Sequence, residues 1–173
     1  MQAKELSSPI LTFFPRFMIA LIGFQIMVFA LHSSIVISTI VQNTLTQVVA
    51  VIHTMLGTEV VVQGNKLIHL HTLQFVVVDN ECTGLMLLAS VCAAIIGLSH
   101  STSNTLKMMI IAVIILQTEN IIRITHLFFV IKQPNNNFDF YHLYFWQIVN
   151  FITGLAIFFI LERKFNKKSD LYV

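Results

Sequence analysis

Four long apolar segments are separated by shorter polar stretches along this chain. The apolar segments cover residues 10–31, 83–99, 106–131 and 143–161. A hydrocarbon core of about 30 Å needs about 20 mainly apolar helical residues, and each segment comes within a few residues of that length. The pattern therefore predicts an all-α polytopic membrane protein with about four transmembrane helices.

Residues 33–56 carry no acidic or basic charge but contain many Ser, Thr, Gln and Asn side chains. A basic cluster follows the fourth apolar segment, with Arg163, Lys164, Lys167 and Lys168. The positive-inside rule puts this cluster in the cytoplasm, and four spans put the basic N-terminal end with Arg16 on the same side. A fifth span would place one basic end on the wrong side. We therefore expect residues 33–56 to form an amphipathic helix on the outer face, interfacial or partly inserted.

Residues 59–78 change to β-branched runs, EVVVQGNKLIHL and QFVVV. Gly64 and Asn65 stand between two such runs, which is typical of a two-residue hairpin turn. On the topology above, this segment lies outside the membrane, as does the loop over residues 132–141. We expect a small β-hairpin that caps the outer ends of the helices.

The composition excludes several classes of protein. Only 10% of the 173 residues are charged and 56% are hydrophobic, with a mean hydropathy of +0.81. Soluble domains carry about 25% charged residues, so a soluble enzyme, a secreted disulfide scaffold and a disordered tail are all excluded. No basic cluster interleaved with aromatic residues is present, so we expect no nucleic-acid partner. The length predicts a single integral membrane domain over residues 1–173.

Three reactive side chains from three different segments are predicted to lie at the outer membrane interface. Cys82 opens the second apolar segment from the outside, and His142 opens the fourth. Arg123 lies about 17 residues into the third segment, roughly 25 Å from its cytoplasmic edge. Polar residues at membrane depth are costly, which makes these residues candidates for function.

The chemistry of these three side chains fits acyl transfer through a thioester. Cys82 and Cys92 are ten positions apart, roughly 15 Å along one helix, which is too far for a disulfide. Cys82 would therefore act as a thiol, and cations or a helix N-terminus favour its thiolate. His142 could take the thiol proton and later protonate a leaving amine. Arg123 could hold a developing oxyanion with its rigid donor fork.

Each of the three residues also has a simpler structural explanation. A cysteine in a membrane helix usually packs as a small side chain, which is our interpretation of Cys92. Glu119 precedes Arg123 by four residues, the favourable order for an ion pair on a helix. His142 could belong to an aromatic belt at the interface. Only their predicted common depth, at the outer interface of the membrane, favours a shared chemical role for the three residues.

A metal or cofactor site is not expected. His69 and His71 are two apart, so on a strand they face the same way, and His53 could join them. No Cys, Asp or Glu has matching spacing for a zinc site. We therefore expect no metal and no cofactor.

Two motifs and one histidine resemble the exosortase and archaeosortase family. The string ECTG at residues 81–84 resembles the family's (A/E)-C-(S/T)-G core, which opens a helix. The string NIIR at residues 120–123 resembles its N-x-x-R element on the next helix, about forty residues downstream. His142 matches the third element at the start of the following helix. The resemblance extends from about residue 57 to the end of the fourth apolar segment.

The resemblance implies a membrane-embedded cysteine transpeptidase. Carried over to this sequence, Cys82 would be the nucleophile, Arg123 the oxyanion or substrate stabiliser, and His142 the acid/base. The supporting residues would be Asn120, Glu81, Thr83 and Gly84. Proteins of this family are thought to cleave a C-terminal sorting signal, composed of a short motif, a transmembrane stretch and a basic tail, on secreted proteins.

The implied partners are such secreted proteins, a lipid or polysaccharide acceptor in the cell envelope, and membrane lipids. The implied location is the plasma (inner) membrane, with a multi-pass chain whose active site faces the outer or periplasmic side. This chain is shorter than the larger family members, so its recognised motif cannot be inferred.

Two alternatives to the transpeptidase stay open at the level of sequence. An intramembrane cysteine protease would use the same thioester with water as the acceptor. A non-enzymatic transport or assembly protein would use Arg123 and Glu119 as a structural pair. The second alternative predicts that substitution of Cys82 has no effect.

Overall fold

The computed structural model describes residues 7–98, 102–133 and 137–166. Its helices are α1 (Ser7–Ser33), α2 (Ile35–Met55), α3 (Leu85–Leu98), α4 (Thr102–Ile131), α5 (Phe138–Phe140) and α6 (Trp146–Asn166). Its strands are β1 (Val60–Gln63), β2 (Lys66–His69) and β3 (Phe75–Val77). A 3₁₀ turn, η1 (Glu81–Thr83), and a π-helical turn, η2 (Tyr141–Phe145), complete the elements. The predicted class, a mainly helical polytopic membrane protein with a small β element, is confirmed.

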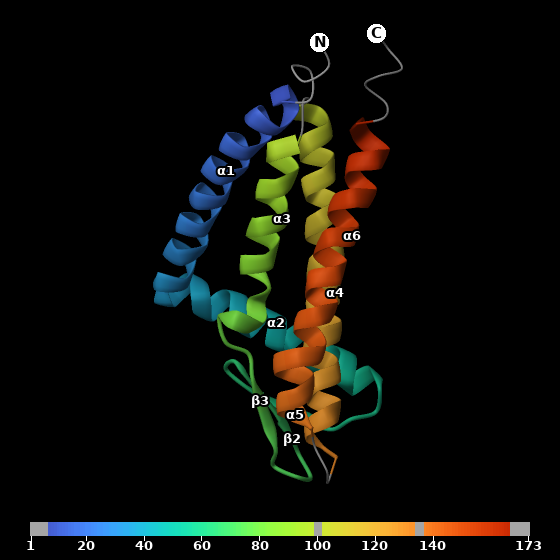
Figure 1. Cartoon of the computed structure of the whole chain (residues 1–173). Helices are drawn as coiled ribbons and strands as arrows, with labels where there is room; N and C mark the ends of the chain where they lie inside the picture. The colour runs from blue at the N-terminus through green and yellow to red at the C-terminus, as the bar shows by residue number, and fades with distance from the viewer. Residues whose placement is uncertain (1–6, 99–101, 134–136, 167–173) are drawn as a thin grey trace.

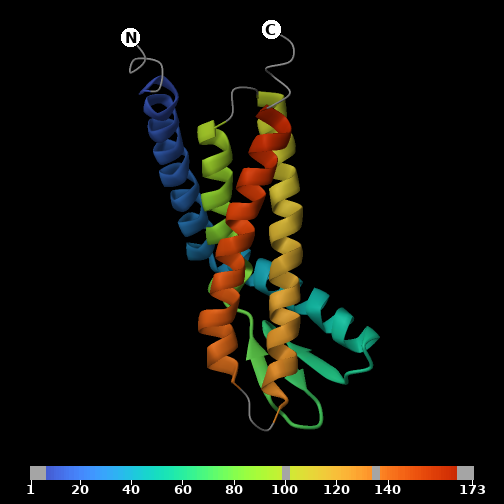
Figure 2. The same ribbon diagram turned by 45° about the vertical axis from the view of Figure 1, so that its right-hand side comes forward.

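Helices α3, α4 and α6 run along the long axis of the molecule, and α1 is inclined to them. The start of α1 lies at the same end as the end of α6 (Figure 1). The sheet lies at the opposite end, together with α2, as Figure 2 shows from a second side. The start of α1 and the end of α6 therefore share one end of the molecule, and their common side of the membrane stays a prediction. The predicted basic residues Lys167 and Lys168 lie outside the described residues.

The helices that are long enough to cross a membrane differ from the expected set. By length and hydropathy they are Thr12–Ser33, Ile35–Met55, Thr102–Ile131 and Phe138–Ile160. The predicted second span over 83–99 was wrong in its length, because α3 has 14 residues and is about 21 Å long. It begins only at Leu85, since Gly84 adopts φ +70° and ends the preceding 3₁₀ turn. Helix α4 has 30 residues, about 45 Å, and reaches beyond α3 to the sheet.

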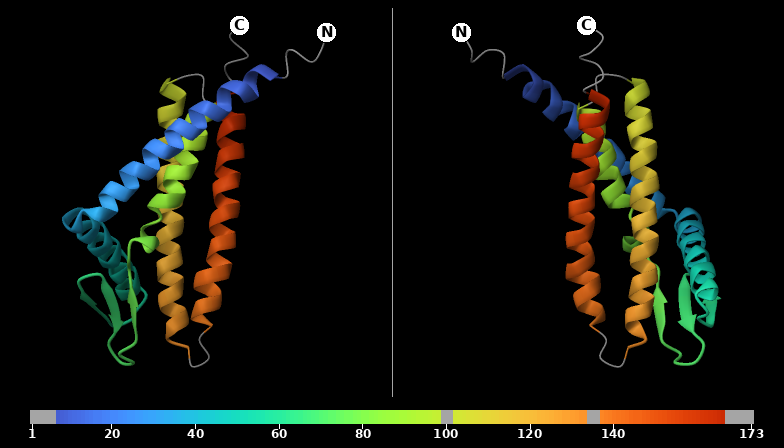
Figure 3. Two further views of the ribbon diagram at one scale, coloured as in Figure 1. Left: turned by 60° about the vertical axis from the view of Figure 1, so that its left-hand side comes forward. Right: turned by 90° about the vertical axis from the view of Figure 1, so that its right-hand side faces the viewer.

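Helix α2 forms where an amphipathic helix was predicted, and several of its polar side chains turn inward. Ser38, Thr46 and His53 are buried, while apolar side chains such as Val36 and Ile40 are exposed. The helix runs obliquely to the axis of the long helices, beside the sheet (Figure 3). Its length and hydropathy also meet those of a membrane span. Ser38, Thr46 and His53 of this segment therefore face the interior of the protein.

The predicted hairpin exists and gains a third strand. The strand order is β1-β2-β3, antiparallel throughout, with Val61 opposite Ile68 and Leu67 opposite Val76. Gly64 in the turn between β1 and β2 adopts φ +61°, which a glycine reaches without strain. One face of the sheet packs against α2 and α4 in a cluster of buried residues that also contains Cys82. The cluster consists of Val49, Ala50, Leu67, Val76, Val78, Cys82, Ile124 and Phe128.

Candidate active site

Cys82 lies in a tight turn over residues 79–84, which we call the cysteine turn. The sequence predicted that Cys82 opens an α-helix, whereas the structure places it in the 3₁₀ turn η1 just before α3. Its backbone N–H donates to the backbone oxygen of Asp79 and to Asp79 Oδ1, both at 3.1 Å. The N–H of Thr83 donates to Asn80 O at 3.3 Å. The backbone donors at and after Cys82 are therefore used inside the turn.

Helix α4 holds the cysteine turn from one side. Asn120 Nδ2 donates to Cys82 O at 2.8 Å in a fully buried hydrogen bond. Gln117 Nε2 donates to Thr83 O at 3.3 Å. A Cβ on Gly84 would lie 3.2 Å from Asn120 Cγ, on a backbone whose φ already favours glycine. The Cys-Thr-Gly sequence and Asn120 thus fit together through close contact.

Helix α2 holds the same turn from the other side. Asn80 Oδ1 accepts hydrogen bonds from Ser38 Oγ at 2.6 Å and from Gln42 Nε2 at 2.8 Å. Asn65 in the hairpin turn donates to Gln42 Oε1 at 3.3 Å. Ser38, Gln42 and Asn80 were not singled out from the sequence. The available signal was a pair of polar residues, Ser38 and Gln42, one helical turn apart in an apolar helix.

Arg123 and His142 meet at one pocket of about 310 Å³ beside the cysteine turn. Its lining residues are Glu81, Leu87, Arg123, His142, Leu143, Gln147, Asn150 and Phe151. The pocket therefore collects one carboxylate, one guanidinium and one imidazole from three segments. Cys82 itself does not line it, although its chain neighbour Glu81 does.

The π-helical turn η2 places His142 in this pocket. The fourth helix was predicted to begin at residue 143, but the structure continues helically from Phe138 through η2 into α6. His142 lies within this π-turn, and Gln147 in the first turn of α6 lines the same pocket. The ring of Phe138 stacks on His142, with ring centroids 5.4 Å apart. Single π-turns often occur at functional sites.

Arg123 is buried without the ion pair that its sequence suggests. Its side chain is only 8% exposed, and its Nε has no hydrogen-bond partner. Among the described residues, the ion pair within 4.0 Å joins His71 and Glu59, not Arg123 and Glu119. In the amide orientation that suits its neighbours, Asn150 donates to Glu119 Oε1 at 3.2 Å and to Trp146 O at 3.3 Å. The guanidinium is therefore left to face the pocket.

The surroundings of Cys82 favour the protonated form of its thiol. Cys82 is 7% exposed and packs in the apolar cluster between α2, the sheet and α4. Burial raises its pKa from 9.0 to about 11; the Asp79 carboxylate also raises it, while the Arg123 guanidinium lowers it. Because the thiolate is the nucleophile, attack by this residue requires a base.

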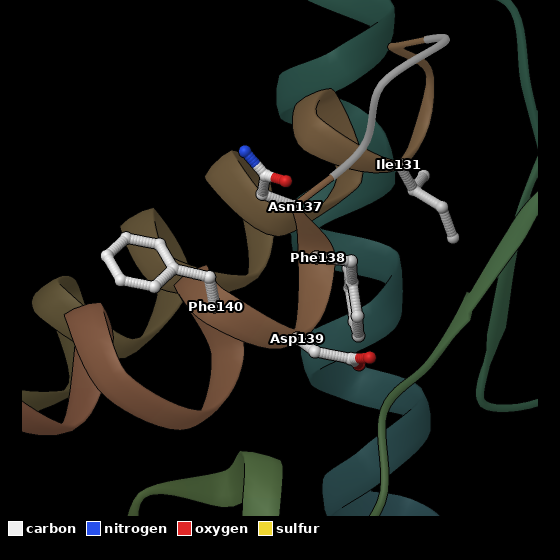
Figure 4. A pocket seen from close by; sticks show the side chains of 5 residues that line it. All are labelled: Ile131, Asn137, Phe138, Asp139 and Phe140. Atoms are coloured by element: carbon white, nitrogen blue, oxygen red, sulfur yellow. The ribbon is translucent and has the colours of Figure 1, made fainter.

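A second hollow of about 410 Å³ lies where α4 ends and α5 begins, lined by Ile131, Asn137, Phe138, Asp139 and Phe140. Figure 4 shows that Ile131, Phe138 and Asp139 point to one side of it, whereas Asn137 and Phe140 point away. Asp139 brings the sole charge among these residues. The hollow joins the candidate site only through Phe138, which stacks on His142.

Two further histidines, His53 and His126, have structural surroundings. His53 lies against the rings of Phe128 and Phe129, with centroids 4.6 and 4.7 Å away. Trp146 Nε1 donates to His126 Nδ1 at 3.2 Å. Within the described parts of the chain, no group of three or more His, Cys, Asp or Glu side chains is placed to hold a metal ion.

Comparison with known proteins shows to which family the chain belongs. The sequence profile of the transmembrane exosortases matches residues 10–161, which is most of the chain and includes the cysteine turn, Arg123 and His142. The protein belongs to the transmembrane exosortase family. No curated protein and no solved structure matches the chain. Family membership supports a role in membrane protein sorting and makes this exosortase a multi-pass membrane protein.

Proposed function

We propose that this exosortase is a cysteine transpeptidase that cleaves the C-terminal sorting signal of secreted proteins and transfers the product to a cell-envelope acceptor. One observation carries the proposal. A buried arginine without an ion partner faces a pocket that it shares with a histidine, next to the turn that holds Cys82. A buried, unpaired charge is costly, and stabilising charge on a bound substrate accounts for its presence.

In the proposed first step, His142 takes the proton of Cys82 and the sulfur attacks the scissile carbonyl carbon. The C–N bond then breaks, the leaving amine receives the proton from His142, and a thioester remains on Cys82. The raised pKa of the thiol supports the need for a base at this step. Because Cys82 packs against the apolar cluster, its Sγ has to turn toward the pocket when the substrate binds.

Arg123 is the proposed stabiliser of the oxyanion. In many acyl-transfer enzymes backbone N–H groups near the nucleophile have this role. Here the N–H groups of Cys82 and Thr83 already donate to Asp79 and Asn80. The Arg123 guanidinium lines the pocket, its Nε has no hydrogen-bond partner, and its fixed fork of N–H donors suits an oxyanion.

The remaining residues of the motif are proposed to hold the nucleophile in place. Asn120 fixes the carbonyl of Cys82, and Gly84 permits the close approach of Asn120. Thr83 Oγ1 donates to Asn80 O at 2.7 Å and closes the turn. Glu81 lines the pocket and is placed to orient His142 or the substrate.

The proposed location is the plasma membrane, with the pocket toward the outer or periplasmic side. The start of α1 and the end of α6 share the end of the molecule opposite the sheet (Figure 1). Basic residues follow α6, and the positive-inside rule assigns them to the cytoplasm. The proposed partners are therefore secreted proteins with a tail of motif, transmembrane stretch and basic cluster, and an envelope acceptor.

The test is processing of a tailed secreted protein in cells that produce Cys82→Ala or Cys82→Ser. We expect both variants to lose processing by more than about 100-fold while inserting normally, because the covalent step is removed. Cys92→Ala is the matched control, since this second cysteine is buried in α3 away from the pocket. Processing that persists in both Cys82 variants contradicts the proposal.

The products identify the acceptor class. Mass spectrometry of the new C-terminus shows an adduct for a transpeptidase and a free carboxylate for a protease that uses water. This measurement separates the proposed function from the protease alternative without any further variant.

A further inference from the structure

The small sheet has an open edge on β3. β3 is the last strand in the order β1-β2-β3, so within the described residues it pairs on one side only, with β2. The N–H of Val78 donates to Asn65 O across this pair at 2.9 Å. Successive residues of an antiparallel strand direct their main-chain groups to opposite sides. The N–H and C=O groups of Phe75 and Val77 therefore point away from β2, to the open edge.

The hollow at the start of α5 lies on the β3 side of the sheet. α2 packs against β1 and β2, and α4 packs against β3. The hollow, of about 410 Å³, is lined by Ile131 at the end of α4 and by residues 137–140. Ile131 and Phe138 point to one side of it (Figure 4) and pack against the buried cluster that contains Val76 and Val78. The open edge of β3 and the hollow are therefore neighbours.

The hollow leads to the polar pocket of Arg123. Phe138 lines the hollow and stacks on His142, which lines the pocket. β3 leads the same way, because Val77 precedes Cys82 by five residues, at most about 17 Å of extended chain. A chain that lies along the open edge of β3 therefore ends at the pocket and at the nucleophile.

The open edge is suited to a peptide. Its free main-chain donors and acceptors match those of another extended chain, and the addition of a strand to a sheet edge is a general way to bind peptides. The charged groups along this path have both signs, with Asp139 in the hollow and Glu81 opposite Arg123 in the pocket. The main chain of the occupant, and not its charge, is therefore what the edge recognises.

We propose that the segment just before the cleavage site of the substrate binds as an added strand on the open edge of β3, parallel to β3. This inference rests on the proposed function. β3 runs from the sheet end of the molecule toward the cysteine turn (Figure 1). A secreted protein with a C-terminal transmembrane stretch enters the membrane in the same direction, so the two chains are parallel. The scissile bond then follows the residue beside Val77 by about five residues.

The test is disulfide formation between the full-length protein without its two native cysteines and a tailed secreted protein of the same cells. Cysteine replaces Phe75 or Val77 in the protein and single positions before the transmembrane stretch in its partner. Neighbouring strands are about 4.8 Å apart, within reach of a disulfide. We expect both variants to link, with the position linked by Val77→Cys about two residues nearer the transmembrane stretch than the position linked by Phe75→Cys.

Val61→Cys is the matched control, because Val61 is 45% exposed and lies in the same cross-strand row as Phe75, on the opposite edge strand β1. We expect no link from this position. Equal yields from Val61→Cys, no link from either β3 position, or a partner position that moves away from the transmembrane stretch overturns the proposal. A link between two copies of the protein, without a link to the tailed protein, identifies a second copy as the occupant and also overturns it.

The failure of this proposal is distinguishable from failure of the proposed function. The disulfide measurement needs no catalysis, since the protein lacks Cys82, whereas the proposed function is tested by processing in the presence and absence of that residue. Processing that depends on Cys82, together with no link at β3, leaves the proposed function in place and removes only the added strand.

Val77→Pro tests the hydrogen bonds of the edge. Proline removes the N–H that points to the open edge and keeps the pairing with β2. Val62→Pro is the matched control, because the N–H of Leu70 donates to Glu59 O and the alternation directs Val62 to the outer edge of β1. We expect Val77→Pro to raise the KM for processing roughly 2- to 12-fold with kcat unchanged, and Val62→Pro to change neither. Equal KM values for the two variants, or a loss confined to kcat, overturns the proposal.

Discussion

The cysteine turn and the pocket beside it differ in how their polar groups are paired. In the turn, the backbone of residues 82 and 83 and the Asn80 side chain are bonded to neighbours on α2, α4 or the turn itself. In the pocket, Arg123 Nε has no partner, and within the described residues His142 only stacks on Phe138. The comparison teaches that the groups we propose to position the nucleophile are paired internally, whereas the two groups we propose to act on the substrate have no hydrogen-bond partner at Arg123 Nε and a ring contact at His142.

The largest effect is expected for Arg123→Gln. If Arg123 stabilises the oxyanion, its loss lowers the processing rate by about 10²–10³-fold. Removing an unpaired buried charge has little cost for the fold, so thermal stability in detergent should be unchanged or higher. Processing and melting temperature measured on the same preparation separate the two effects.

Arg123→Lys is the control for that substitution. Lysine keeps the charge but loses the rigid fork, so we expect a rate between those of the wild type and Arg123→Gln. If a variant at position 123 unfolds, or if it processes its substrate normally, Arg123 has a structural role. The pocket would then not differ from the cysteine turn in the way described above.

A smaller effect is expected for Asn120→Ala, which breaks the buried hydrogen bond to Cys82 O. An unsatisfied buried acceptor costs about 1–3 kcal/mol. If this free energy is lost from the correct placement of Cys82, the processing rate drops roughly 5- to 150-fold. Thr118→Ala on the same helix is the matched control, because the Thr118 hydroxyl is exposed and donates within α4. Equal rates for the two variants would mean that Asn120 does not position the cysteine.

The smallest effect is expected for Asp79→Asn, read out through the pH dependence of Cys82 alkylation by iodoacetamide. Because its pKa is raised to about 11, the thiol is almost fully protonated at neutral pH, and its reactivity grows as the pH rises toward that value. Removing the Asp79 charge lowers the pKa, so labelling at a given pH below 11 should rise severalfold. If the pH dependence of Cys82 alkylation is the same in Asp79→Asn as in the wild type, burial alone keeps the thiol protonated. Cys92→Ala supplies the background for this measurement.

The hydrophobic pattern predicted the class of fold but not which helices are long. The segments around α1, α4 and α6 were located because a membrane span needs a continuous apolar run. The segment of α3 is equally apolar but loses its first residues to the 3₁₀ turn that ends at Gly84. The β-branched run QFVVV that contains β3 was recognised, but its pairing as a third strand was not predicted, because the pattern indicated only a hairpin.

The candidate site, like the fold, was predicted only in part from the sequence. Arg123 and His142 were singled out from the sequence as polar residues near helix ends, and the structure brings them to one pocket. The expected pair of Arg123 with Glu119 is absent between these two described residues, since helical spacing permits an ion pair without requiring it. The π-turn that contains His142 was not predicted from the sequence.

The sequence by itself determined that this protein is embedded in a membrane, that it is mainly helical, and which residues carry the family motif. These properties follow from local features, namely hydropathy, helix length and short strings of residues. Only the tertiary structure decided that α2 turns its polar side toward the cysteine turn, and that Cys82 is buried beside the pocket and does not line it. These outcomes depend on hydrogen bonds between residues such as Ser38 and Asn80, which are 42 positions apart. Such pairs form only when the packed helices bring them together.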